Sequence, residues 1–173
     1  QILVWNKIDA AGLEPSVERG EDGTISRVFV SAQKGSGLDL LREAIVDWFA
    51  RRRGVDDLSV ANVLPTIGSK ELVALMPLML GLGRGDVVVH PTVAYPTYAI
   101  GAALVGATAV ASDDPADWPE NTRLIWLNSP GNPDGRVLDV DELKAAVARA
   151  RELGAVVASD ECYAELNWQG AEP

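Results

Sequence analysis

The chain has 173 residues, 47% of them hydrophobic, which is enough to bury a sizeable core in one or two domains. Its net charge of −10 lacks the basic excess typical of nucleic-acid-binding proteins. A single cysteine, Cys162, excludes an intrachain disulfide, and no apolar run reaches the roughly 18 residues of a membrane span. We therefore expect a cytoplasmic protein that binds neither nucleic acid nor a membrane.

Strands and helices alternate along the whole sequence. The predicted elements are, in chain order, a strand at 2–5, a loop at 10–24, a strand at 27–31, a helix at 38–52, a helix at 71–80, a strand at 86–89, a helix at 96–105, and strands at 108–111 and 123–127, followed by a helix at 141–153 and a strand at 155–159. Such alternation predicts an α/β fold of three layers, a mainly parallel sheet with helices on both faces. We expect the first two strands to join or flank the sheet formed by the later ones.

Two loops near the start of the chain carry residues that can read guanine. In "NKID" the carboxylate of Asp9 can accept hydrogen bonds from guanine N1–H and the exocyclic amine, a pair that adenine does not offer. The stem of Lys7 can cover the base, and the amide of Asn6 can fasten the loop. The later loop "SAQKGSG" offers backbone N–H groups at Ser31 and Ala32 to guanine O6.

These loops resemble the last two nucleotide motifs of P-loop GTPases, in particular the HflX-type GTPases, over about the first 45 residues. The resemblance implies that the "NKID" residues read guanine and that Ser31 and Ala32 back the base. The sequence holds no G-x-x-x-x-G-K-[ST] phosphate loop, and phosphate and magnesium contacts supply most nucleotide affinity. We interpret the segment as a remnant without GTPase activity and do not expect GTP or GDP as a cofactor; a weak guanine-nucleotide-binding module is the alternative.

Two later loops carry the chemistry of a pyridine cofactor. "NSPGNPDG" (128–135) and "SDECY" (159–163) each follow a predicted strand, and one helix joins the two strands. A right-handed crossover makes such strands parallel, so both loops should lie at one sheet edge. There Asp160 can keep a pyridine nitrogen protonated, while Asn132 and Tyr163 can bond a phenolic oxygen, which suits pyridoxal phosphate.

Two stretches upstream complete this predicted site. "GSKE" opens a helix whose free N–H groups, together with the Ser69 hydroxyl, can hold a phosphate. "YPTY" offers Tyr95 to stack on the ring. Each residue alone is also explained by a turn, a cap or the core, but their combination and order favour the cofactor site.

From about residue 38 to the end, these stretches resemble the large domain of fold-type I aminotransferases of class I/II, most of all the actinobacterial-type N-succinyldiaminopimelate aminotransferases. The resemblance implies an aminotransferase that uses pyridoxal 5′-phosphate. It assigns the cofactor to Ser69, Lys70, Tyr95, Asn132, Asp160 and Tyr163, with Ser69 and Lys70 as the phosphate pair. Asp134 departs from the family, which usually has Thr there, and adds a carboxylate near an anionic cofactor.

The Schiff-base lysine of that family has no counterpart in this sequence. The lysines are Lys7, Lys34, Lys70 and Lys144. In the family the reactive lysine follows the Asp-Glu-x-Tyr loop, and none of these four matches it. We therefore assign no catalytic residue and no metal site, and expect an incomplete aminotransferase segment that binds pyridoxal phosphate weakly, at most non-covalently.

The two resemblances meet on one amphipathic helix, around residues 38–52. We interpret the chain as a chimera, engineered or recombined, with a GTPase-derived segment at 1–45 and an aminotransferase-derived segment at 38–173. The opening "QILVWNKID" lacks an initiator Met, so we expect a piece of something longer. Unpaired sheet edges favour a homodimer. The alternative is a purely structural chimera that binds no ligand.

Overall fold

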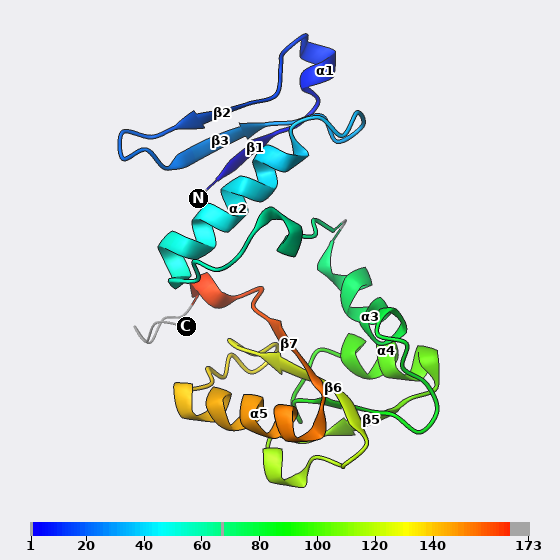
Figure 1. Ribbon diagram of the computed structural model, residues 1–173. Helices are drawn as coiled ribbons and strands as arrows, with labels where there is room; N and C mark the ends of the chain where they lie inside the picture. Colours follow the sequence, from blue (N-terminus) through cyan, green and yellow to red (C-terminus); the bar gives the residue numbers. More distant parts are fainter. Residues whose placement is uncertain (1, 67, 167–173) are drawn as a thin grey trace. The chain divides into compact units, whose positions relative to one another are not determined.

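The computed structural model describes residues 2–66 and 68–166, and the chain divides into two compact units, 1–66 and 67–173 (Figure 1). The first unit contains β1 (Leu3–Trp5), α1 (Ile8–Ala11), β2 (Ser16–Arg19), β3 (Ile25–Phe29), α2 (Leu38–Arg53) and the 3₁₀ helix η1 (Val60–Asn62). The second contains α3 (Ser69–Met79), β4 (Val87–His90), α4 (Thr97–Val105), β5 (Thr108–Ala111), η2 (Pro115–Asp117), β6 (Thr122–Asn128), α5 (Val140–Leu153), β7 (Val156–Asp160) and η3 (Ala164–Leu166). Among these described residues, no helix combines the length and the apolar character that crossing a membrane requires.

The first unit is a three-stranded sheet with one long helix against it. The strand order is β1-β3-β2, with β1 parallel and β2 antiparallel to β3. Ala44 of α2 packs into one buried cluster with Ile25 and Val28 of β3 and with Val30, which follows this strand. The range 10–24 is predicted to be a loop, but it contains β2. The sequence of this strand, "SVER", does not alternate apolar and polar residues and its side chains are mostly exposed, so periodicity does not reveal it.

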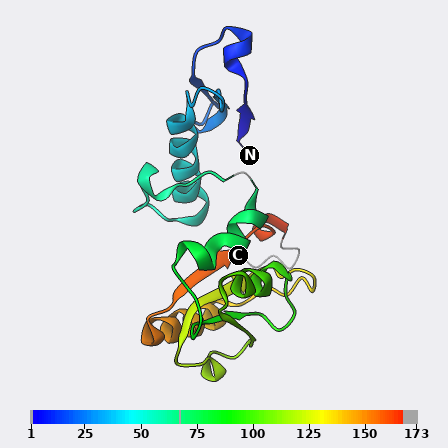
Figure 2. The same ribbon diagram turned by 90° about the vertical axis from the view of Figure 1, so that its right-hand side faces the viewer.

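The second unit is a parallel sheet between two layers of helices. The strand order is β5-β4-β6-β7, and all three pairings are parallel. Successive residues of one strand point to opposite faces, so Val88 packs with Tyr98 of α4 while Val89 packs with Ala150 of α5. α3 and α4 thus cover one face and α5 the other, as the two views show (Figure 2). The predicted three-layer α/β architecture is confirmed for this unit.

The strands at 2–5 and 27–31 are predicted to join or flank this sheet, and the prediction that they join it is wrong. β3 pairs with β1 on one side and with β2 on the other, in a sheet separate from that of the second unit. Alternation of strands and helices predicts strand direction but not which strands pair. β2 and β3 are joined by a short turn, and closing so short a loop costs less entropy than pairing with a distant strand.

Local sequence signals define α5, which carries the chain from β6 back to β7. The Asp139 carboxylate accepts hydrogen bonds from the N–H groups of Asp141 and Glu142, and the Glu142 side chain accepts one from the Asp139 N–H. This capping box starts the helix, and Gly154, at φ 65°, ends it in the left-handed conformation that glycine adopts without strain. The crossover makes β6 and β7 parallel, so their carboxyl ends meet.

A glycine allows α3 and α4 to approach closely. A Cβ atom added at Gly101 of α4 would lie 2.9 Å from the backbone oxygen of Ala74 in α3. Any larger residue therefore requires one helix to shift. Gly101 lies one turn after the buried Tyr98, so a shift of α4 at Gly101 would also move Tyr98.

Candidate functional site

All six residues predicted to hold a cofactor line one cavity of about 190 Å³ in the second unit. Four further residues line it: Val73, Tyr98, Asn128 and Cys162. The cavity lies where parallel strands end, because β6 closes with Asn128, β7 closes with Asp160, and these two residues are in register. Ligands of open α/β sheets bind at this edge.

The residues predicted to bind the phosphate begin α3. Ser69 and Lys70 are the first two residues of the helix, and Gly68 precedes them at φ 80°. The first turn of a helix leaves its N–H groups without intrahelical partners, and the helix dipole places partial positive charge there. Ser69 and Lys70 are exposed, so an anion can reach them.

The residues predicted to bind the ring lie at the ends of β4, β6 and β7 or in the loops that follow these strands. Tyr95 precedes α4 and packs edge-on against Tyr98, with ring centroids 6.1 Å apart. Asn132 lies in the turn after β6, and Tyr163 follows β7 with 39% of its surface exposed. The structure therefore brings together the six side chains that the sequence predicts to form one site, although they are spread along the chain between Ser69 and Tyr163.

Asn128 ties two of these loops together and was not predicted as a site residue. Its side-chain amide donates a 2.8 Å hydrogen bond to the backbone oxygen of Asp160. Its side-chain oxygen accepts a 2.9 Å hydrogen bond from the backbone N–H of Asn132. Asn128 is only 7% exposed. The signal available in the sequence was a polar residue at the end of the apolar run that forms β6. A side-chain amide buried at such a place needs hydrogen-bond partners.

Tyr98 is the second residue that the sequence analysis missed. Its hydroxyl donates a 2.8 Å hydrogen bond to Oδ2 of Asp160, and its side chain is fully buried. Burial, together with the hydrogen bond to Asp160, raises the pKa of the Tyr98 phenol far above its ordinary value. The available signal was its place in "YPTY", three residues after Tyr95 and in the first turn of the helix predicted at 96–105.

Cys162 lies at the same carboxylate. Its backbone N–H donates a 3.3 Å hydrogen bond to Oδ1 of Asp160, and its sulfur lies 3.8 Å from the Ser69 hydroxyl. The interaction of the thiol with Asp160, followed by partial burial, raises the pKa of Cys162. The sole cysteine of the chain is therefore a neutral thiol at physiological pH.

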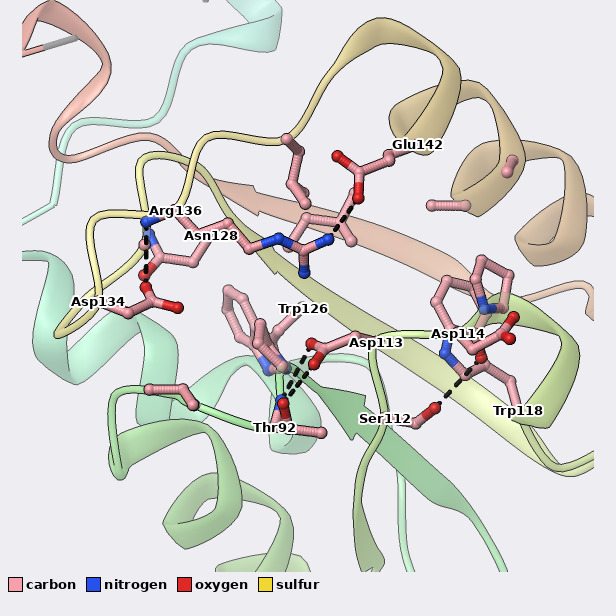
Figure 3. A pocket seen from close by; sticks show the side chains of 18 residues that line it. Thr92, Ser112, Asp113, Asp114, Trp118, Trp126, Asn128, Asp134, Arg136 and Glu142 are labelled. Atoms are coloured by element: carbon pink, nitrogen blue, oxygen red, sulfur yellow. Dashed lines mark hydrogen bonds and ion pairs between the residues drawn. The ribbon is translucent and has the colours of Figure 1, made fainter. Parts of the chain in front are cut away.

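A larger cavity of about 520 Å³ opens nearby, between the loop after β4, the segment leading to η2 and the start of α5 (Figure 3). Its charged side chains are already engaged: Arg136 pairs with Glu142, and the Thr92 hydroxyl donates to Asp113. Asp134 lines this larger cavity and not the smaller one, and it accepts a 3.2 Å hydrogen bond from the Arg136 N–H. The carboxylate that departs from the family pattern thus does not line the predicted cofactor cavity.

The residues predicted to read guanine lie together in the first unit. The side-chain oxygen of Asn6 accepts hydrogen bonds from the N–H groups of Lys7, at 2.7 Å, and Ala32, at 3.0 Å. The Ser31 hydroxyl donates a 2.7 Å hydrogen bond to Asp9 and lowers the pKa of that carboxyl. Two loops distant in sequence are thereby fastened side by side.

Comparison with known proteins identifies the class. The sequence profile of the family Aminotransferase class I and II matches residues 17–173. The chain is 50% identical to a probable aminotransferase of Mycobacterium tuberculosis over 139 residues, which are 80% of this chain and 33% of that protein. It is 48% identical to the 4-dedimethylamino-4-oxo-anhydrotetracycline transaminase of Streptomyces rimosus over 133 residues, which are 76% of this chain and 37% of that protein.

The fold agrees with solved structures. The N-succinyldiaminopimelate aminotransferase from Mycobacterium tuberculosis superimposes with a TM-score of 0.70 and 31% identity, covering 78% of this chain and 38% of that one. The chain therefore belongs to the class I and II aminotransferases, and it spans about a third of the length of these relatives. The family match begins at residue 17, inside the predicted 1–45 segment. These matches give no support to a GTPase segment or to a chimera.

Proposed function

We propose that this chain is a cofactor-binding part of a class I and II aminotransferase and holds pyridoxal phosphate without a covalent bond. One observation carries the proposal: the six residues selected by chemistry and order line a single cavity at the carboxyl edge of a parallel sheet. When bound, the cofactor supplies an electron sink in its protonated pyridine ring.

The donor set fits the cofactor from end to end. The first turn of α3, with Ser69 and Lys70, offers hydrogen bonds and positive charge to the phosphate. The Asp160 carboxylate offers a negative charge to the protonated ring nitrogen. Tyr95 offers an aromatic face, while Asn132 and Tyr163 offer hydrogen bonds to the phenolic oxygen. Asn128 and Tyr98 hold the ring-binding groups in place.

We expect no transamination by the 173-residue chain. Lys70 is the one lysine among the described residues that line the cavity, and it begins α3, at the end assigned to the phosphate. A lysine there is not positioned to carry a proton at the carbonyl carbon of the cofactor. Loss of a positioned acid or base costs about 10² to 10⁴ in rate. Glutamate-dependent conversion of the cofactor to its amine form by the purified chain would refute this part.

A titration with pyridoxal phosphate tests binding. The absorbance of the cofactor and the quenching of tryptophan fluorescence should both saturate with one cofactor bound per chain, and dialysis should reverse both signals. Ser69→Ala should weaken the binding of pyridoxal phosphate, and inorganic phosphate should compete less well for this variant than for the wild type. Ser112→Ala, a serine of the larger cavity, is the matched control and should change neither. A signal that rises without saturation would mean non-specific reaction with surface amines.

A weak guanine-nucleotide-binding module remains the second candidate. The hydrogen bonds Asn6–Ala32 and Asp9–Ser31 favour it, because they hold both guanine-reading loops ready for a base. The test is fluorescence of a mant-labelled GDP with the wild type and with Asp9→Ala. Saturable binding that Asp9→Ala abolishes supports the module; identical curves for the two proteins reject it.

The chimeric origin, the homodimer and the cytoplasmic location also remain proposals. Exposed leucines on the adjacent helices α3 and α4, Leu78 at 61% and Leu104 at 66%, support self-association. Light scattering of the wild type and of Leu104→Glu tests it, with a dimer expected only for the wild type. If the titrations with pyridoxal phosphate and with mant-labelled GDP both fail to saturate, the proposal that remains is a structural chimera that binds no ligand.

A further inference from the structure

We propose that Tyr98 is a positioning residue, which holds the Asp160 carboxylate in the orientation that engages the ring nitrogen of the cofactor. The inference rests on the proposed function and goes beyond it, because Tyr98 is buried behind Asp160 and is not among the groups assigned to the cofactor. The contact that carries it is the 2.8 Å hydrogen bond from the Tyr98 hydroxyl to Oδ2 of Asp160.

The hydroxyl of Tyr98 is fixed in place by its surroundings. The side chain has no exposed surface. Its ring stacks on Trp126 of β6, with centroids 4.9 Å apart and planes inclined by 22°. Val73 of α3 and Ala102 of α4 belong to the same buried cluster. A fully buried phenol that stacks on Trp126 cannot follow the carboxylate, so the carboxylate must orient to the phenol.

The carboxylate needs such a partner. The terminal torsion of an aspartate is broad, and a half-buried carboxylate at the end of a strand can rotate. Tyr98 binds Oδ2, and the Cys162 N–H binds Oδ1 at 3.3 Å, so both oxygens have a fixed donor. A carboxylate has about four lone-pair sites, which leaves acceptor capacity for a ring N–H. Both donors are neutral, so they orient Asp160 without neutralising its charge.

Tyr98 also connects two cofactor contacts. It packs edge-on against Tyr95, the residue assigned to the ring face, with planes at 85°. The same side chain thus contacts the group that sets the plane of the ring and the group that meets its nitrogen. A single buried aromatic side chain, Tyr98, therefore contacts both Tyr95 and Asp160.

The alternative is that the Tyr98 hydroxyl merely satisfies a buried donor. A cofactor analogue in which carbon replaces the ring nitrogen separates the two roles, because it keeps the phosphate, the phenolic oxygen and the aromatic face. The ratio of the two affinities reports the Asp160–nitrogen interaction alone. A purely structural change alters both affinities together and leaves the ratio unchanged.

The experiment measures dissociation constants of pyridoxal phosphate and of this analogue for the wild type, Tyr98→Phe, Asp160→Asn and Trp126→Phe. The wild type should prefer pyridoxal phosphate, and Tyr98→Phe should reduce the preference about five- to tenfold while changing analogue affinity by less than about twofold. Asp160→Asn should abolish the preference. Trp126→Phe is the control: it keeps the Tyr98 hydroxyl and an aromatic ring for Tyr98 to stack on, so the affinities for both ligands should fall by a similar factor and the preference should stay.

Each other outcome is decisive. An unchanged preference in Tyr98→Phe, or an equal loss for both ligands, overturns the positioning role while cofactor binding stands. Saturable binding without any preference in the wild type also overturns it. Failure of the wild type to bind either ligand rejects the proposed function and the inference together. If Tyr98→Phe does not fold, the hydroxyl proton signal of Tyr98 in the wild type decides: pyridoxal phosphate should shift it and the analogue should not, and equal shifts contradict the proposal.

Discussion

Asn128 and Asp160 end neighbouring parallel strands in register, and the Asn128 side chain donates a 2.8 Å hydrogen bond to the Asp160 backbone oxygen. The same side chain accepts from the Asn132 N–H. One buried amide therefore fixes the spacing between two loops that are 28 residues apart, counted from Asn132 to Asp160. The cavity that we propose for the cofactor depends on that spacing.

Asn128→Ala should destabilise the second unit by about 2 to 4 kcal/mol, because it leaves the partly buried N–H of Asn132 and the partly buried carbonyl of Asp160 without this partner. Urea denaturation followed by circular dichroism measures the loss. Asn121→Ala, which removes an exposed hydrogen bond to the Gly85 oxygen, is the control and should cost less than about 1 kcal/mol. Equal losses in the two variants would show that Asn128 does not link the loops.

Gly101→Ala should lower the free energy of unfolding by about 1 to 3 kcal/mol, since the added methyl meets the Ala74 oxygen at 2.9 Å. It should also weaken pyridoxal phosphate binding, because a shift of α4 moves Tyr98. Gly83→Ala is the control: its added methyl meets nothing closer than 3.9 Å. Thermal unfolding of both variants checks the first effect, and wild-type stability in Gly101→Ala would contradict the close packing of the helices.

The stability of the chain should fall at alkaline pH. The pKa of Tyr98 is raised in the folded state, so its contribution is fully present below the unfolded value of about 10 and is lost as the pH rises above it. The slope for one such group reaches about 1.4 kcal/mol per pH unit. Tyr98→Phe should make this decline less steep. Part of the decline should remain, because the pKa of Cys162 is also raised in the folded state. Parallel stability curves for the two proteins between pH 8 and about 11 would contradict the assignment.

Cys162 reports on the Asp160 carboxylate chemically. Because Asp160 raises the pKa of the thiol, Asp160→Asn should increase the thiolate fraction and speed alkylation by iodoacetamide about two- to fivefold at pH of about 8. The chain has one cysteine, so mass spectrometry reads the rate directly. Asp134→Asn, on the larger cavity, is the control and should keep the wild-type rate.

The sequence predicts much of the second unit and of the cofactor set, because apolar runs, loop residues and the parallel crossover act locally. Predicted strands and helices from 71 to 159 lie within a few residues of those observed. Tyr98 escapes such reasoning, since its partner Asp160 is 62 residues away and its role appears only once α4 packs on the sheet. β2 escapes because its strand character comes from pairing with β3, not from its side chains. The separation into two sheets depends on strand pairing, which periodicity does not encode.

The most direct test of the cofactor site is the affinity of pyridoxal phosphate for the wild type, Asp160→Ala and Asp9→Ala, measured by the same titration. Asp160 lines the cavity, whereas Asp9 bonds Ser31 in the other unit. Removal of one partner of a charged contact typically costs about 1.5 to 3 kcal/mol, so Asp160→Ala should bind about 10- to 100-fold more weakly, while Asp9→Ala should match the wild type. Equal affinities for the two variants would contradict the assignment of the cofactor to this cavity.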